Sequence, residues 1–331
     1  MRTRSVSGQQ VTEIGLGCMS LSHAYGAPPP REDGICLLQH ALDLGCTFFD
    51  TAALYGFGAN ETLVGEALSH RRREFLLASK CGINRNAEGK REINGRPEAI
   101  KRTCEESLQR LKTDVIDLYY LHRWDKRVPI EESVGALADL VAQGKVRTIG
   151  LSEVSAETLR KAHAVHPIAA VQSEYSLWTR NPEIAVLDAC RELGAAFVAF
   201  GALGRGFLTG ALKDLAGLVE GDIRRGMPRF QGENFRKNLD LVAAFREVAR
   251  DQHCTPAQLA LAWVLAQGDH VVPIPGTTRI DHLEEDFAAA DVKLSPATLQ
   301  RLDDLINPRT VNGARYNAAT QTEIDTEELA A

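Results

Sequence analysis

Short apolar runs along this sequence finish on polar residues. Five consecutive runs do so, and their last residues are Asp50, Lys80, His122, Ser152 and Gln172. A strand buried on both faces gains nothing from a charged or amide end, because burying such a group without a partner costs several kcal/mol. In a barrel of parallel strands these ends meet at one mouth. The pattern therefore predicts that these side chains share a site.

Tyr55, which follows Asp50 by five residues, adds a possible proton donor to this set. A free tyrosine has a pKa near ~10, so it is a weak acid at neutral pH. The ammonium of Lys80 would lower that pKa, and Asp50 would hold Lys80 charged and oriented. His122 would orient a carbonyl or relay a proton. Such a site protonates an oxygen while another group delivers a hydride.

The hydride donor is expected to be a cofactor, because protein side chains do not supply hydride. No motif for another kind of chemistry competes for this site. The sequence contains no H-E-x-x-H motif, no zinc-spaced cluster and no G-x-S-x-G elbow, so no metal is predicted. Gly15 and Gly17 do not form a Rossmann fingerprint, since Ser20 stands where the third glycine would be. Phosphates would instead meet loop amides and cations in 204–206 and 276–279.

Composition limits the class of protein. The chain has 331 residues, of which 44% are hydrophobic and 25% charged, and its net charge of −6 gives no reason to expect nucleic acid or an anionic membrane as a partner. No segment approaches the ~20 apolar residues of a membrane span. The seven cysteines are scattered and the first residues lack a secretory signal, so we expect reduced thiols and a cytoplasmic location.

Apolar runs alternate with amphipathic helical patterns in eight β-α units. Continuous apolar runs are typical of parallel strands that are covered on both faces. Eight such units suit either a closed (β/α)8 barrel of the TIM type or a long doubly wound sheet. No linker divides residues 1–331, so one domain is expected, with long loops after the third and seventh strands at 82–97 and 204–238. The acidic residues 318–331 are expected to form a mobile tail.

Several segments together resemble the aldo-keto reductase superfamily, from about Ile14 to Asn307. They are FFDTAALYGFGANETLVGEAL (48–68), LASKCG (77–82), YYLHRWD (119–125), the stretch 150–178 that begins GLSE, and VVPIPGTTRIDHLEED (271–286). The match is close to a branch of bacterial and plant reductases that carries G-L-S-E and P-I-P-G-T. The resemblance implies a barrel that reduces aldehydes and ketones with NADP(H), and a small carbonyl compound as its partner.

The resemblance also implies roles for individual residues. Tyr55 would be the general acid in a catalytic tetrad with Asp50, Lys80 and His122. The cofactor would be bound at its nicotinamide by Ser152, Gln172 and Phe200, and near its pyrophosphate by Leu203, Gly204 and Arg205. Its 2′-phosphate and adenine would be bound by Gly276, Thr277, Thr278, Arg279 and Glu285. The preference for NADP(H) over NAD(H) rests largely on Arg279.

Some residues leave alternatives open. Glu153 and Asp286 stand where asparagine is common in the family, which puts their cofactor contacts in question. Met19, Trp124 and Trp178 could line a substrate pocket or pack under loops. The β subunits of potassium channels share this fold and tetrad, so a cofactor-sensing regulatory subunit is the alternative function.

Overall fold

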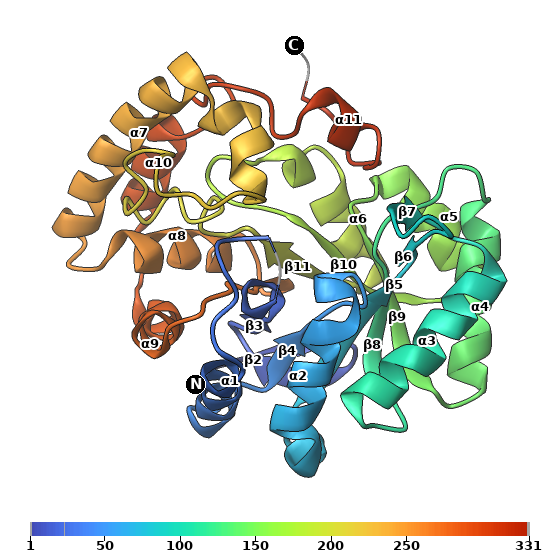
Figure 1. Ribbon diagram of the computed structural model, residues 1–331. Coiled ribbons are helices and arrows are strands. Elements are labelled where there is room, and N and C mark those ends of the chain that lie inside the picture. The colour runs from blue at the N-terminus through green and yellow to red at the C-terminus, as the bar shows by residue number, and fades with distance from the viewer. Residues whose placement is uncertain (1, 23, 330–331) are drawn as a thin grey trace.

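A barrel of parallel strands forms the centre of the computed structural model, which describes residues 2–22 and 24–329 (Figure 1). Each neighbouring pair in its eight-stranded sheet is parallel. In spatial order the strands are β3 (Leu16–Gly17), β4 (Phe48–Asp50), β5 (Leu76–Cys81), β8 (Ile116–Leu121), β9 (Val146–Ser152), β10 (Ile168–Glu174), β11 (Ala196–Phe200) and β12 (Val271–Pro273).

Two backbone hydrogen bonds join the first and last strands and so close the barrel. The amide of Gly15 donates to the carbonyl of Pro273 at 3.0 Å, and the amide of Gly17 donates to that of Pro275 at 2.9 Å. A Cβ on Gly17 would lie 2.7 Å from the carbonyl oxygen of Ile274, so only glycine allows this approach. The predicted (β/α)8 barrel is confirmed, and the doubly wound sheet is excluded.

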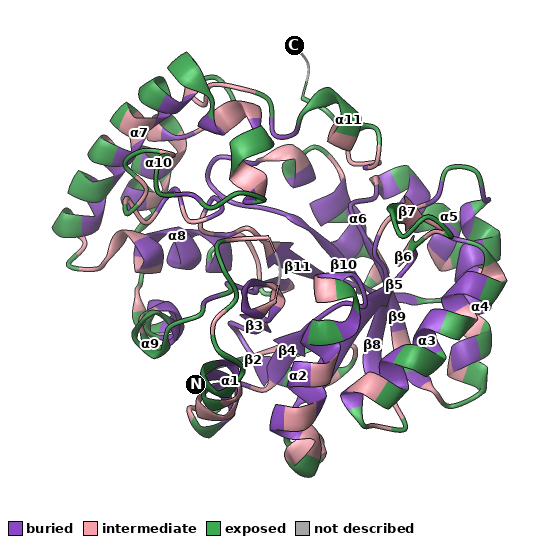
Figure 2. Cartoon of the chain, in the orientation of Figure 1, coloured by how far each residue is buried: buried purple, intermediate pink, exposed green. Residues whose placement is uncertain are grey.

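Helices surround the barrel and turn their apolar sides toward it, as Figure 2 shows by burial. In α4, Ile130, Val134 and Leu137 are all buried at the predicted helical spacing. The outer helices are α1 (Arg31–Asp43), α2 (Ala59–Leu68), α3 (Pro97–Leu111), α4 (Ile130–Ala142), α5 (Ala156–Val165), α6 (Val186–Leu193), α7 (Gly232–Asp251), α8 (Pro256–Leu265), α9 (Ile280–Ala288) and α10 (Pro296–Leu305).

Helix starts lie where capping residues predict them. Ser155 accepts a hydrogen bond from the amide of Thr158 at the start of α5, and Ser295 caps α10 in the same way. Thr255 forms a full capping box with Gln258 at the start of α8. These three caps confirm the predicted starts.

A hairpin that the sequence analysis did not predict closes the bottom of the barrel. It pairs β1 (Thr3–Val6) with β2 (Gln9–Thr12) in antiparallel fashion. Its buried Val6 and Val11 pack with Phe48 from β4 and with other side chains inside the barrel. The strands' opposite, carboxyl ends remain available for a site.

The two predicted long loops contain local structure. The first includes an antiparallel hairpin of β6 (Ile83–Arg85) and β7 (Arg91–Ile93). The second contains two short 3-10 turns, η5 (Ile223–Gly226) and η6 (Pro228–Phe230), and α7 begins at Gly232. The prediction that the second loop extends to residue 238 was therefore wrong, because its last residues already form the first turns of α7.

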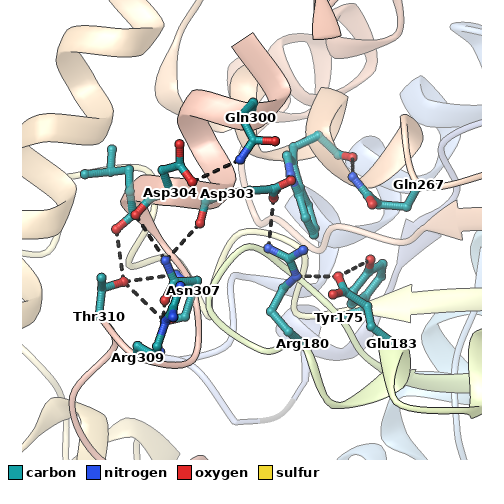
Figure 3. A network of polar contacts seen from close by, with 12 residues as sticks. Tyr175, Arg180, Glu183, Gln267, Gln300, Asp303, Asp304, Asn307, Arg309 and Thr310 are labelled. Carbon is teal, nitrogen blue, oxygen red and sulfur yellow. Dashed lines mark hydrogen bonds and ion pairs between the residues drawn. The ribbon is translucent and has the colours of Figure 1, made fainter. Parts of the chain in front are cut away.

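A polar network holds α10 against the barrel (Figure 3). Arg180 forms ion pairs with Glu183 and with Asp303 of α10, the latter at 2.9 Å. The indole nitrogen of Trp263 in α8 also donates to Asp303, at 3.1 Å. Trp263 is fully buried, as the core position predicted from its apolar helix requires.

The chain's last described residues lie against the barrel near its mouth. We call residues 315–327 the C-terminal strap; it includes α11 (Ala318–Gln321). Ile324 is buried, and Glu323 forms a two-pronged ion pair with Arg91 of β7, with both distances 2.7 Å. The side chain of Asp325 accepts hydrogen bonds from the amide and hydroxyl of Ser155 at the start of α5. Residues 318–327 of the strap belong to the acidic segment 318–331 for which the sequence predicts mobility, and they contact the β6–β7 hairpin and the start of α5.

Candidate active site

A cavity of about 880 Å³ opens at the carboxyl ends of the strands. Its wall brings together residues from separate strand ends, as the sequence predicts. The predicted site residues in the wall are Met19, Asp50, Tyr55, His122, Ser152, Gln172, Phe200, Leu203, Arg205, Gly276, Thr277, Thr278 and Arg279. Lys80 is fully buried behind this wall.

Tyr55, Lys80 and Asp50 form a connected group at the base of the cavity. Tyr55 lies in η2 (Tyr55–Gly58), the 3-10 turn that follows β4. The ammonium of Lys80 donates to the Tyr55 hydroxyl at 3.1 Å and to the carbonyl of Thr51 at 2.8 Å, and it forms an ion pair with Asp50. The His122 ring meets the Tyr55 ring edge to face, with centroids 5.8 Å apart.

Burial and neighbouring charges oppose each other in setting the pKa values of Tyr55 and Lys80. It raises the pKa of Tyr55 above its ordinary value, while the charge of Lys80 acts in the opposite direction. Burial alone would lower the pKa of Lys80, but Asp50 and Tyr55 raise it above its ordinary value. Lys80 therefore stays charged and Tyr55 stays protonated. The predicted lowering of the Tyr55 pKa is opposed by a larger desolvation effect that the sequence does not reveal.

Gln172 and Ser152 have protein partners inside the site. The side-chain amide of Gln172 donates to the second carboxylate oxygen of Asp50 at 2.7 Å. Gln172 therefore orients Asp50, a role that was not predicted for it. Ser152 is nearly fully buried at the end of β9, and its hydroxyl accepts a hydrogen bond from Arg123 at 3.3 Å.

The predicted pyrophosphate residues separate into two groups. Leu203 faces the cavity, but Gly204 is not part of the wall: it has a left-handed φ of +58°, and a Cβ there would lie 3.1 Å from the Trp178 ring. The guanidinium of Arg205 lines the cavity but is already paired with Glu174. It also donates to the hydroxyls of Tyr25 at 3.1 Å and Tyr316 at 2.9 Å.

A buried cluster of alternating charges ties the strap to the strand ends. Arg315 of the strap forms ion pairs with Glu153 at 2.6 Å and with Glu174 at 3.1 Å. Burial favours the neutral form of Glu174, but Arg205 and Arg315 outweigh it and lower its pKa to about 2. Glu153 thus has a structural partner in the strap. Arg315 and Tyr316 were not predicted, because no local pattern shows which distant carboxylate an arginine will meet.

The predicted phosphate site lies at the amino end of α9. Gly276, Thr278 and Arg279 are exposed there, and the Thr277 hydroxyl accepts a hydrogen bond from the Arg279 amide at 3.1 Å. Backbone N–H groups at a helix start attract anions. The side chain of Arg279 forms an ion pair with Asp281 of the same helix.

The two acidic residues predicted near the adenine differ in their surroundings. Glu285 is half-buried on α9 and is not part of the cavity wall. Its neighbour Asp286 is only 4% exposed. Burial raises the pKa of Asp286 to about 8, and the charge of Glu285 adds to the effect. A protonated Asp286 presents a hydroxyl where a family asparagine would present an amide.

The three predicted pocket residues are not together. Met19 lines the cavity. Trp178 is buried instead in an aromatic cluster, stacked on Phe207 with centroids 4.8 Å apart and edge to face with Phe230. The indole nitrogen of Trp124 donates to the carbonyl of Val128 at 2.9 Å, and this ring packs against the core outside the cavity wall. For both tryptophans the structure matches the packing alternative.

The described residues, 2–22 and 24–329, show neither a metal-binding cluster nor a disulfide. No group of three histidine, cysteine, aspartate or glutamate side chains in this part could hold a metal ion. Every helix described is too short or too polar to cross a bilayer. Each of the seven cysteines is free, and five of them are buried.

A barrel with a tyrosine, a lysine, an aspartate and a histidine at its mouth is typical of one class of protein. Comparison of the sequence with known proteins identifies that class. Residues 13–307 match the aldo/keto reductase family, and the chain belongs to that family. It is 48% identical over 328 residues to a Schizosaccharomyces pombe protein named aldo-keto reductase yakc NADP(+), covering 97% of this chain and 96% of that one.

Solved structures agree with this assignment. A glycerol dehydrogenase of Gluconobacter oxydans has a TM-score of 0.85 and 30% identity, covering 92% of this chain and 96% of that one. An aldo/keto reductase of Klebsiella pneumoniae, solved in complex with NADP and acetate, has a TM-score of 0.72 and 29% identity, covering 96% of this chain and 99% of that one.

Proposed function

We propose that this protein reduces aldehydes and ketones to alcohols with NADP(H), and that Tyr55 is its general acid. The observation that carries the proposal is the Tyr55 hydroxyl in the cavity wall, with the buried ammonium of Lys80 3.1 Å behind it. The names of the yeast relative and of the Klebsiella complex, both of which include NADP, support the choice of cofactor.

Each residue of the tetrad has its own role in the proposed reaction, and Gln172 supports one of them. His122 and Tyr55 hydrogen-bond the carbonyl oxygen and so make its carbon more electrophilic. Tyr55 then gives its proton to that oxygen, and the ammonium of Lys80 stabilises the phenolate that results. Asp50 keeps Lys80 charged and in place, and Gln172 holds the second oxygen of Asp50. The cofactor, when bound, supplies the hydride that reaches the carbonyl carbon.

The residues present fit NADP(H). Ser152 and Phe200 would hold the nicotinamide ring from the ends of β9 and β11, and Leu203 would lie near the pyrophosphate. The exposed amino end of α9, with Thr278 and Arg279, suits a 2′-phosphate because amides and a guanidinium there both favour an anion. Arg205 is already paired with buried Glu174, so we expect it to hold the cavity wall in place and not to bind a phosphate directly.

The alternative function, a cofactor-sensing subunit, would keep the same fold and tetrad. It predicts cofactor binding with little turnover. The cytoplasmic location expected from the sequence remains part of the proposal and agrees with seven free cysteines.

One assay tests the proposed function. The protein is mixed with NADPH and 4-nitrobenzaldehyde, oxidation of the reduced nicotinamide is followed by absorbance, and the alcohol product is quantified. We expect repeated turnover with one alcohol formed per NADPH oxidised. Binding of NADPH without alcohol formation, across a panel of aldehydes and ketones, would contradict a reductase and favour the sensing subunit.

A further inference from the structure

Five arginines line the cavity, and they differ in whether their charge is already balanced. Among the described residues, four of them have a carboxylate partner: Arg91 with Glu323, Arg205 with Glu174, Arg224 with Asp222 and Arg279 with Asp281. Arg123 is the exception, because no carboxylate in the described part of the chain lies within ion-pair distance of it. Among the described residues, Arg123 is therefore the one cavity arginine without a carboxylate partner.

Arg123 lies beside His122 of the tetrad, and hydrogen bonds hold its side chain there. It directly follows His122 at the end of β8, and it is half-buried in the cavity wall. Its Nη1 donates to the carbonyl of His122 at 2.6 Å and to the Ser152 hydroxyl at 3.3 Å. These bonds engage only Nη1 of its three nitrogens, so Nε and Nη2 keep donors for another acceptor.

The charge of Arg123 acts on Tyr55. Against the larger effect of burial, it is one of the charges that lower the pKa of the Tyr55 hydroxyl. A substrate whose carbonyl oxygen meets Tyr55 and His122 would have its next atoms near this positive charge, because Arg123 follows His122 in the wall of the same cavity. A cation in a partly water-excluded cavity attracts an anion more strongly than one in water.

We propose that Arg123 binds a carboxylate of the substrate, and that the preferred substrates are aldehydes or ketones that carry a carboxylate. The inference rests on the proposed reductase function and names its substrate class. A planar guanidinium edge matches a carboxylate with two parallel hydrogen bonds. A carboxylate also balances the single unpaired charge, whereas a doubly charged phosphate would leave one negative charge without a partner.

Arg123 has a competing role, which is to hold Ser152 and so serve the cofactor alone. That role predicts a weaker affinity for NADPH in an Arg123 variant and an equal loss of rate for every carbonyl substrate. The proposed role predicts a loss that depends on the substrate's charge. A matched pair of substrates separates the two.

The test compares 4-carboxybenzaldehyde with its neutral methyl ester, methyl 4-formylbenzoate, at saturating NADPH. The enzymes are the unmutated protein, Arg123→Met, Arg123→Lys and the control Arg301→Met, which removes an exposed surface arginine of α10. For each enzyme the ratio of kcat/KM for the acid to that for the ester is measured, together with the KM for NADPH.

We expect the unmutated protein to favour the acid, and Arg123→Met to reduce the acid-to-ester ratio at least about tenfold, mainly through KM. Arg123→Lys should restore part of the ratio, and Arg301→Met should keep all of it. Equal kcat/KM for acid and ester in the unmutated protein, or an unchanged ratio in Arg123→Met, overturns the inference while leaving the reductase intact. No turnover of either aldehyde contradicts the proposed function itself.

Discussion

Tyr55 is subject to two opposing influences at the scale of a single residue. Lys80 favours its ionised form, and burial favours the protonated form more strongly. The sequence allowed the residue types and the sign of the Lys80 effect to be predicted, because both follow from chemistry. It did not allow the net pKa direction to be predicted, because desolvation depends on how tightly distant segments cover the site.

The partner of Glu153 could not be predicted from the sequence either. Its place after Ser152 suggested a cofactor contact that its carboxylate made uncertain. Its partner in the structure is Arg315, which lies 162 residues further along the chain. A pairing over that separation leaves no local pattern in the sequence.

Asp286 provides a stability prediction at the residue scale. Its folded pKa of about 8 lies far above that of an unfolded aspartate, near ~3.9. Between these values the folded state holds a proton that the unfolded state lacks, so rising pH lowers the stability by up to about 1.4 kcal/mol per pH unit. Asp286→Asn removes this dependence, because an amide does not ionise.

We therefore expect the free energy of unfolding of Asp286→Asn, relative to the unmutated protein, to rise from about pH 4 to about pH 8 and then level off. Urea unfolding at several pH values measures this difference. The control is Asp291→Asn, which changes an exposed carboxylate just beyond the same helix. A difference that does not vary with pH would show that Asp286 is ionised in the fold.

At the scale of elements, the amino end of α9 combines an attractive and a repulsive group for phosphate. Arg279 is exposed, but its guanidinium is engaged by Asp281 in the first turn of the helix. A 2′-phosphate must displace this carboxylate or share the guanidinium with it. If the 2′-phosphate binds here as proposed, the preference for NADPH over NADH depends on the balance between these two residues.

Two variants at this helix end test that balance. Arg279→Ala should weaken NADPH binding roughly tenfold or more, and Asp281→Asn should tighten it severalfold, because the released guanidinium can meet the phosphate bidentately. NADH, which lacks the 2′-phosphate, should bind nearly equally to all three proteins and serves as the internal control. Titration by cofactor fluorescence gives these affinities. Parallel changes for NADH and NADPH would contradict a 2′-phosphate site here.

Elements differ in how well the sequence predicts them. The barrel strands and caps such as Thr255 were predictable because burial on both faces and a capping box leave strong local patterns. The hairpins 3–12 and 83–93 were not, since their strands are short and their buried faces small. The sequence also left the role of Trp178 open. The rings that bury it come from the loop after the seventh strand, whose conformation has no local sequence pattern.

In the whole molecule, the first and the last described segments of the chain complete the barrel. The hairpin of β1 and β2 fills its bottom, and the C-terminal strap contributes Tyr316 to the cavity wall at its mouth. The tetrad depends on the parallel pairing of the strands, because Asp50, Lys80 and His122 come from or follow three neighbouring strands, β4, β5 and β8. The parallel sheet thus brings residues that are distant in sequence into the one group that we propose to transfer the proton.

The turnover of Tyr55→Phe tests the proposed role of Tyr55 as the general acid. The variant keeps the ring that packs against His122 and removes only the hydroxyl that Lys80 contacts. We predict that aldehyde reduction falls by about 100-fold or more while NADPH affinity stays within about threefold of the unmutated value. Turnover equal to that of the unmutated protein would contradict Tyr55 as the general acid.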